Sequence, residues 1–205
     1  MSSNKKSSRN TLLMSVVMSS PGPLIVGLGL MAGKSSTQLA DFVRRTSELL
    51  GIIMAYVIYR ITTKGGKEDP AKKAKLEKFS NIFVGAMMCL GGAIMLVLAF
   101  VSENEEKGNV IPGLAVAVMG VIANTAFFVK YTRLNKAEPN PIIAVQARLY
   151  RAKSLVDFCV TVALLSVAIA PDSPVSYYLD MAGSAIVALY LLWCGIRTVY
   201  EKIKK

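Results

Sequence analysis

The chain has 205 residues, of which 53% are hydrophobic, and it carries a formal net charge of +11 with no histidine. This composition, with a mean hydropathy of +0.47, excludes an ordinary soluble domain and favours an all-α protein that crosses a membrane several times. The basic residues lie in short connectors between apolar runs. That distribution argues against nucleic acid as a partner.

Six apolar stretches are each long enough to cross the roughly 30 Å hydrocarbon core of a bilayer as a helix. Pro21 and Pro23 are expected to kink the first of them. None alternates with a period of two, so a β-barrel is excluded. The chain ends at Lys205, and we expect one domain, 1–205, without a C-terminal soluble domain. The predicted spans are about 11–33, 36–61, 78–102, 109–131, 142–170 and 175–200.

The connectors between these spans alternate in charge. Lys and Arg dominate the N-terminal tail, the 60–78 and 130–141 loops and the C-terminal end, whereas the 102–108 loop, SENEEKG, has three Glu and one Lys. An even number of spans places both termini on one side, and the positive-inside rule predicts that this side is cytoplasmic. We therefore expect a multi-pass protein of the cell membrane.

Small residues gather in the third predicted span, where Gly85, Gly91 and Gly92 occur with Ala86 and Ala93. Small side chains allow helix backbones to approach closely within a membrane. This span is therefore predicted to pack tightly against a neighbouring helix.

Ionisable residues lie deep in two of the spans. In the second, Asp41, Arg44 and Glu48 recur at three- and four-residue steps and so share one helical face. In the fifth, Asp157 follows Lys153 by four residues. We expect Arg44 to pair with Glu48 and Lys153 with Asp157, and the two carboxylates to meet at similar depth. Further polar candidates within the spans are Asn81, Asn124, Thr125 and Asp180.

Two interpretations of these charges remain open. Charged groups inside a membrane cost at least a few kcal/mol and usually mark a substrate or proton pathway. The alternative is a structural network of ion pairs that holds the helices in register. Such a network is a weak explanation, because replacing buried ion pairs by apolar residues is often neutral or stabilising.

The same stretches resemble the transmembrane domain of the cation diffusion facilitator, or cation efflux, family. In the second span, Ala40-Asp41 matches the family pattern, and Arg44 and Glu48 stand at two of its metal-binding positions. In the fifth span, Lys153 and Asp157 stand at the other two. The sixth begins with Asp180 followed by small residues, and Lys75-Leu76-Glu77 stands before the third. The resemblance covers about 11–203. It implies a six-helix domain that exports divalent metals in exchange for protons.

The chain departs from the family pattern at two of the four binding positions. Arg44 cannot be a metal ligand, and Lys153 could coordinate only without its proton. The resemblance leaves Glu48 and Asp157 as metal ligands, with Asp41 as an additional substrate- or proton-binding carboxylate. Carboxylates without histidine would favour manganese or magnesium over zinc. Arg44 and Lys153 become charge-compensating residues, and Lys153 alternatively carries the exchangeable proton.

The sequence thus predicts a secondary transporter that moves a cation against protons through an intramembrane charged site. It predicts no enzyme and no cofactor, since nucleotide-binding and nucleophile motifs are absent, and a divalent cation would be the substrate. The expected partners are membrane lipid, the cation, protons and a second copy of the chain held by its helices. One alternative is a non-transporting scaffold or regulatory subunit whose metal site is replaced by salt bridges. Another is an anion or organic-ion transporter that uses Arg44 and Lys153.

Overall fold

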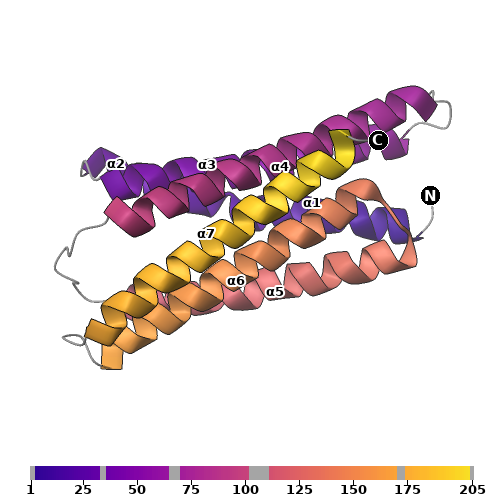
Figure 1. Ribbon diagram of the computed structural model, residues 1–205. Coiled ribbons are helices and arrows are strands. Elements are labelled where there is room, and N and C mark those ends of the chain that lie inside the picture. Colours follow the sequence, from indigo (N-terminus) through magenta and orange to yellow (C-terminus); the bar gives the residue numbers. More distant parts are fainter. Residues whose placement is uncertain (1–2, 33–35, 65–69, 102–110, 170–173, 204–205) are drawn as a thin grey trace.

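The computed structural model describes residues 3–32, 36–64, 70–101, 111–169 and 174–203, although some side chains within these ranges are not described. Helices account for nearly all of the described chain, and no strand occurs in it. The helices form one elongated bundle, with both chain termini at the same end (Figure 1). In chain order they are α1 (Ser3–Ser19), α2 (Pro21–Ala32), α3 (Ser36–Lys64), α4 (Pro70–Val101), α5 (Ile111–Ala137), α6 (Pro141–Ile169) and α7 (Pro174–Ile203).

The first predicted span is divided into α1 and α2 at Ser20. Pro21 and Pro23 have no backbone N–H to continue the hydrogen-bond ladder, while proline is well suited to the first turn of a new helix. The Ser20 amide and hydroxyl both donate to the Val16 carbonyl, at 3.0 and 2.7 Å, which satisfies a carbonyl at the end of α1. The predicted kink is confirmed, and it takes the form of a break.

Local sequence also determines where other helices begin. Pro70, Pro141 and Pro174 are the first residues of α4, α6 and α7, the position at which proline's missing N–H costs nothing. Asn140 caps α6, because its Oδ1 accepts hydrogen bonds from the amides of Ile142 at 2.9 Å and Ile143 at 3.3 Å.

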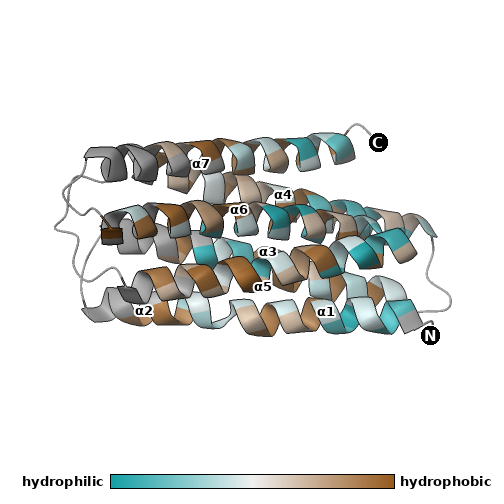
Figure 2. Ribbon diagram, turned by 90° about the horizontal axis from the view of Figure 1, so that it is seen from below, coloured by the Kyte–Doolittle hydropathy of each residue, from teal (hydrophilic) through white to brown (hydrophobic). Residues whose placement is uncertain are grey.

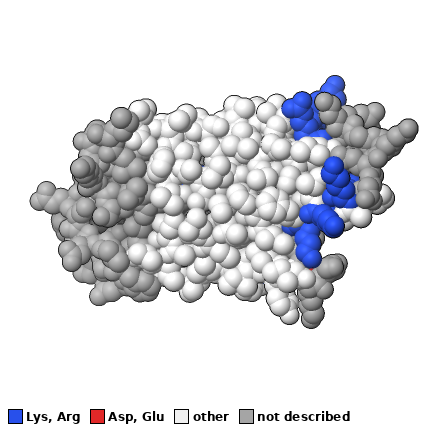
Figure 3. Space-filling model, turned by 90° about the horizontal axis from the view of Figure 1, so that it is seen from above, with Lys and Arg blue, Asp and Glu red and all other residues white. Residues whose placement is uncertain are grey.

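The surface of the bundle is apolar across its middle. Met119 is 69% exposed and Ile169 75% exposed, and hydrophobic residues are frequent along the middle of the bundle, whereas hydrophilic residues gather toward the end that holds the termini (Figure 2). Large apolar patches are rare on soluble monomers and mark surfaces that contact lipid or protein. On the face seen in Figure 3, Lys and Arg gather at the end with the termini.

Length and composition identify one helical segment, Pro70–Val97, as able to cross a membrane among the residues whose side chains are described. The remaining five spans stay a prediction from the complete sequence. The all-α fold class is confirmed for the described ranges.

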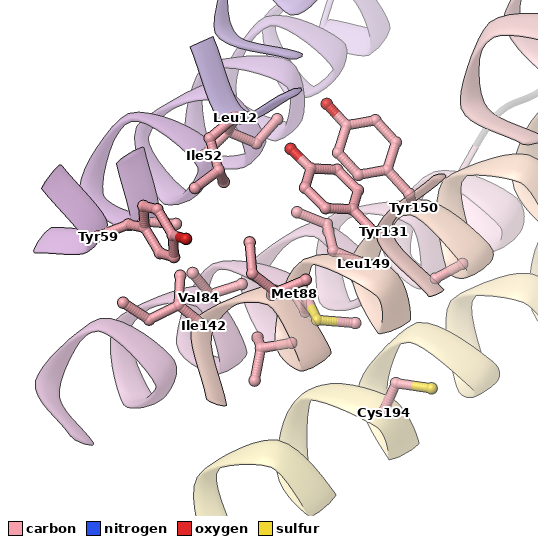
Figure 4. Packing of buried hydrophobic residues seen from close by; sticks show 14 of the residues in the cluster. Leu12, Ile52, Tyr59, Val84, Met88, Tyr131, Ile142, Leu149, Tyr150 and Cys194 are labelled. Atoms are coloured by element: carbon pink, nitrogen blue, oxygen red, sulfur yellow. The ribbon is translucent and has the colours of Figure 1, made fainter. Parts of the chain in front are cut away.

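The tightest helix contact joins α4 to α7 through glycines. A Cβ on Gly85 would lie 3.0 Å from the Gly195 carbonyl oxygen, and one on Gly92 would lie 3.0 Å from the Ala188 carbonyl oxygen. Both distances are shorter than ordinary van der Waals contact, so the predicted close approach of this span is confirmed at Gly85 and Gly92. Beside this contact, side chains from α1, α3, α4, α5, α6 and α7 form one apolar cluster, including Leu12, Ile52, Val84, Met88 and Ile142 (Figure 4).

Candidate ion-binding site

A buried ion pair joins α3 to α6. Lys153 Nζ lies 3.2 Å from Glu48 Oε2, and the two side chains are only 14% and 7% exposed. The sequence pattern had suggested that Lys153 pairs with Asp157 on its own helix. Glu48 on the neighbouring helix is the partner in the structure, and a lysine that precedes an acidic residue by four positions is the less favourable order for pairing within a helix.

The Asp157 carboxylate is held against α5. Its Oδ2 accepts a hydrogen bond of 2.5 Å from Asn124 Nδ2. A Cβ on Gly120, one turn before Asn124, would lie 2.5 Å from the same oxygen. Gly120 therefore leaves the space that the carboxylate occupies, and Asn124 supplies the donor. Nearby, the hydroxyls of Thr125 and Ser154 form a second polar link between α5 and α6, at 2.6 Å.

The buried pair Glu48 and Lys153, together with the partly buried Asp157, makes up one charged group. Asp157 lies one helical turn beyond Lys153, about 6 Å along α6, and its charge adds to the attraction on the ammonium. A single ammonium is thus positioned near carboxylates from two different helices. Asp157 is therefore offset from Glu48 by about one helical turn along the bundle, and the meeting of the two carboxylates and their binding of a cation stay predictions.

Three predicted residues lie in helices at positions whose side chains are not described. Positions 41 and 44 belong to α3 and position 180 to α7, but the side chains of Asp41, Arg44 and Asp180 lie outside the described part of the chain. The pairing of Arg44 with Glu48 therefore stays a prediction, as does the contribution of Asp41 to the site.

An aromatic cluster borders the buried lysine. The Lys153 ammonium lies 5.3 Å from the centre of the Tyr150 ring, a cation–π distance. Tyr150 in turn packs against Tyr131 and Phe127, with ring centroids 5.4 and 5.0 Å away, and the Tyr131 hydroxyl lies 2.8 Å from Ser15 Oγ. Tyr131 and Tyr150 appear side by side in Figure 4.

A second ionic cluster lies near the end with the termini. Glu201 accepts hydrogen bonds of 2.8 Å from Arg197 Nε and from Arg148 Nη1. The bond from Arg197, and then that from Arg148, lowers the pKa of the Glu201 carboxyl below its usual value. Because these side chains are between about one third and one half exposed, water screens the cluster, and it contributes little to stability.

Sequence reasoning missed Gly120, Tyr150 and Gln146. Tyr150 and Gln146 precede Lys153 by three and seven residues, spacings that place all three on one helical face. That periodicity was the available signal. Gly120 had no comparable signal, because its importance depends on how α5 packs against Asp157.

Metal coordination has limited support in the described residues. They contain no cluster of three or more His, Cys, Asp or Glu side chains that could hold a metal ion. The charged group offers two carboxylates and one amine. The side chain of Asp41, the additional carboxylate suggested by the sequence, lies outside the described part of the chain.

An all-helical bundle with an apolar surface and buried charges defines a helical membrane protein. The family model for the cation efflux transmembrane domain matches residues 12–205. The chain therefore belongs to the cation efflux family, a family of membrane cation transporters, and the resemblance identified from the sequence is confirmed. A search of curated proteins finds no match.

Proposed function

We propose that this protein is a secondary transporter that moves a cation across the cell membrane in exchange for protons. The cation binds between Glu48 on α3 and Asp157 on α6, and Lys153 compensates their charge when no cation is bound. The observation that carries the proposal is the buried contact of Lys153 with Glu48 at 3.2 Å. Intramembrane ionisable groups of this kind are functional by default.

The charges suggest how cation binding is coupled to a proton. Two carboxylates and one ammonium give the described group a net charge of −1. A divalent cation that takes the carboxylates leaves Lys153 without its counter-ion. If the ammonium then releases a proton, the bound group becomes neutral, with one divalent cation gained and one proton lost. Protonation of Lys153 reverses the step and favours release of the cation.

The arrangement of the bundle supports a specific topology. Both termini lie at the end where Lys and Arg gather (Figures 1 and 3), and that end is assigned to the cytoplasm by the positive-inside rule. The break between α1 and α2 is counted within one span, which gives six crossings. We further propose that two copies associate through the apolar surfaces of their helices, a contact that would leave the buried charges within each copy.

Transport by purified protein in liposomes tests the proposal. With a proton gradient across the vesicle membrane, uptake of Mn²⁺, Mg²⁺ or Zn²⁺ is expected for the wild-type protein. Glu48→Gln and Asp157→Asn each remove one negative charge with little change in shape, so both should abolish uptake. Each variant must elute as a folded protein in detergent, which separates lost transport from lost structure.

Glu201→Gln provides the matched control. It makes the same change from carboxylate to amide at the partly exposed end of α7, outside the buried group, and uptake should stay at the wild-type level. Wild-type uptake in both Glu48→Gln and Asp157→Asn would refute the assignment of the site.

A second candidate is a non-transporting scaffold or regulatory subunit, and one observation favours it. The Lys153–Glu48 contact already neutralises one carboxylate, and Asn124 already satisfies an oxygen of the other. Thermal unfolding separates the two candidates, since a cation that binds at a hundredfold excess over its Kd should stabilise the fold by ~2.7 kcal/mol. Melting that no divalent, monovalent or organic cation changes would favour the scaffold.

A further inference from the structure

Two amide side chains are fully buried without any hydrogen-bond partner in the described chain. Asn81 on α4 is 1% exposed and Gln146 on α6 is 0% exposed, and in both residues the amide nitrogen and the amide oxygen are unpartnered. The Ser80 hydroxyl, next to Asn81, is also fully buried and unpartnered. Buried polar groups in native proteins are almost always satisfied by protein or by ordered water.

The two amides lie at the same level of the bundle. Gly51 of α3 packs against Val84 and Met87 of α4. Because these helices run in opposite directions, Asn81 is level with about residue 55 of α3. Gln146 precedes Lys153 by seven residues. Because Lys153 lies beside Glu48, Gln146 is also level with about residue 55 of α3.

Helix geometry places this level about 10 Å from the Glu48–Lys153 pair, toward the end that holds the termini. α4 and α6 contact each other directly, and Val84 and Ile142, each within four residues of one of the amides, belong to one buried cluster (Figure 4). Asn81 and Gln146 therefore face the same interior, between the charged pair and the basic end of the bundle.

We propose that Asn81, Gln146 and Ser80 form an internal water-binding site, which connects the charged pair to the cytoplasmic end. Amide groups supply both donors and acceptors, and a hydroxyl supplies one of each, so the three side chains can hold water molecules that make several hydrogen bonds. Within the described chain, no protein group forms a hydrogen bond with these side-chain atoms in place of water.

Polar side chains continue from this level toward the end with the termini. Tyr59 on α3 is buried, and the Thr63 hydroxyl donates a hydrogen bond of 2.6 Å to its backbone carbonyl. Ser8 and Thr62 are buried as well. These groups extend the polar interior to the last turns of α3, and in the proposal they lie between the water site and the end with the termini.

The water site does not depend on transport, but its role as an access route for protons or a cation rests on the proposed function. The test therefore begins with a measurement that needs no transport. Cysteine is introduced as Asn81→Cys or Gln146→Cys in a full-length background in which Cys89, Cys159 and Cys194 are replaced by alanine. The thiols are then treated with a small hydrophilic methanethiosulfonate.

Ile142→Cys is the matched control. Ile142 is 0% exposed and lies one helical turn nearer the end with the termini than Gln146, so depth alone would make its cysteine react sooner. Because the thiolate is the reactive form and needs water, Asn81→Cys and Gln146→Cys should react about tenfold faster than the control. Rates no faster than that of Ile142→Cys would overturn the proposal.

Leucine substitutions give a second measurement for variants that label poorly. In a dry core, Asn81→Leu and Gln146→Leu would remove unsatisfied polar groups and raise the melting temperature. At a water site they displace bound water, and the melting temperature should stay level or fall while cation uptake slows. A rise in melting temperature for both variants would contradict the water site. Fast cysteine labelling in a protein without uptake would retain the water site and reject the transporter.

Discussion

The α4–α7 contact and the α3–α5–α6 contacts are built in opposite ways. At the first, backbone lies on backbone, so that a Cβ on Gly195 would be 2.7 Å from the Gly85 carbonyl oxygen. At the second, side chains hold the helices together through the Lys153–Glu48 ion pair and the Asn124–Asp157 hydrogen bond. Glycine contacts leave no alternative arrangement, whereas ion pairs and hydrogen bonds can exchange partners.

This difference assigns different roles to the two regions. The α4–α7 pair is expected to move as one rigid unit, because sliding one helix on the other would force atoms into the same space. Under the proposed function, the α3–α5–α6 region contains the groups whose partners would change when a cation or a proton binds. Substitutions in the first region should act on stability, and substitutions in the second on stability and binding together.

The largest effect is expected from breaking the buried ion pair. Lys153→Met removes the ammonium that lies 3.2 Å from Glu48 Oε2 in the bundle interior, and loss of one member of a buried pair costs ~3–5 kcal/mol. The double variant Glu48→Leu/Lys153→Met removes both charges and should recover most of that loss. Unfolding in detergent by denaturant measures both variants, and equal destabilisation of the single and double variants would contradict the pairing.

A smaller effect is expected at the glycine contact. Gly195→Ala places a Cβ 2.6 Å from Cys89 Sγ and 2.7 Å from the Gly85 carbonyl oxygen, so α4 and α7 must separate, at a cost of ~1–3 kcal/mol. Gly51→Ala is the matched control, because its Cβ would meet nothing closer than Met87 Cβ at 3.7 Å. Thermal unfolding should show a clear loss for the first variant only. Similar melting for both would show that the α4–α7 contact is not tight.

The hydroxyl contact between α1 and α5 should contribute less. Tyr131→Phe removes the hydroxyl that lies 2.8 Å from Ser15 Oγ, and a typical hydrogen bond contributes ~1 kcal/mol. Ser15 also donates to the Leu12 carbonyl at 2.8 Å, so it keeps one bond. A double-mutant cycle with Ser15→Ala measures the coupling, and additive effects of the two substitutions would exclude it.

The smallest effect, and the one that depends on pH, is expected at Glu201. Arg197 and Arg148 lower the pKa of this carboxyl in the folded protein. Its contribution is therefore present above the pKa of the unfolded chain and is lost as the pH falls through the folded value. Glu201→Gln should lower the melting temperature slightly at pH 7 and have no effect well below pH 4. A difference from wild type that is unchanged at the lower pH would argue against the ionic contacts.

Much of the architecture could be predicted from sequence. Runs of apolar residues indicated the helices, Pro21 and Pro23 indicated the break, and Gly85 with Gly92 indicated a close helix contact. Each of these signals acts locally or through side-chain size. The partner helix α7 was not predictable, because Gly195 becomes informative only when two helices are already aligned.

The candidate site was predictable only in part, because its residues give local signals but its contacts depend on which helices are neighbours. Charges in an apolar run indicated Glu48, Lys153 and Asp157, since their cost in a membrane does not depend on the partner. Their pairing depends on which helices are neighbours, and four-residue spacing therefore did not indicate Glu48 as the ion-pair partner of Lys153. Asn124 was a polar candidate, but its contact with Asp157 required the packing of α5 on α6.

Proton release on cation binding tests the central claim most directly. Purified wild-type protein in weakly buffered detergent is mixed with a divalent cation that raises its melting temperature, and a pH indicator counts the protons set free. The proposed exchange at Lys153 predicts about one proton per cation for wild type, and binding with no release from this step for Lys153→Met. Equal proton release from the two proteins would contradict the claim that Lys153 carries the exchanged proton.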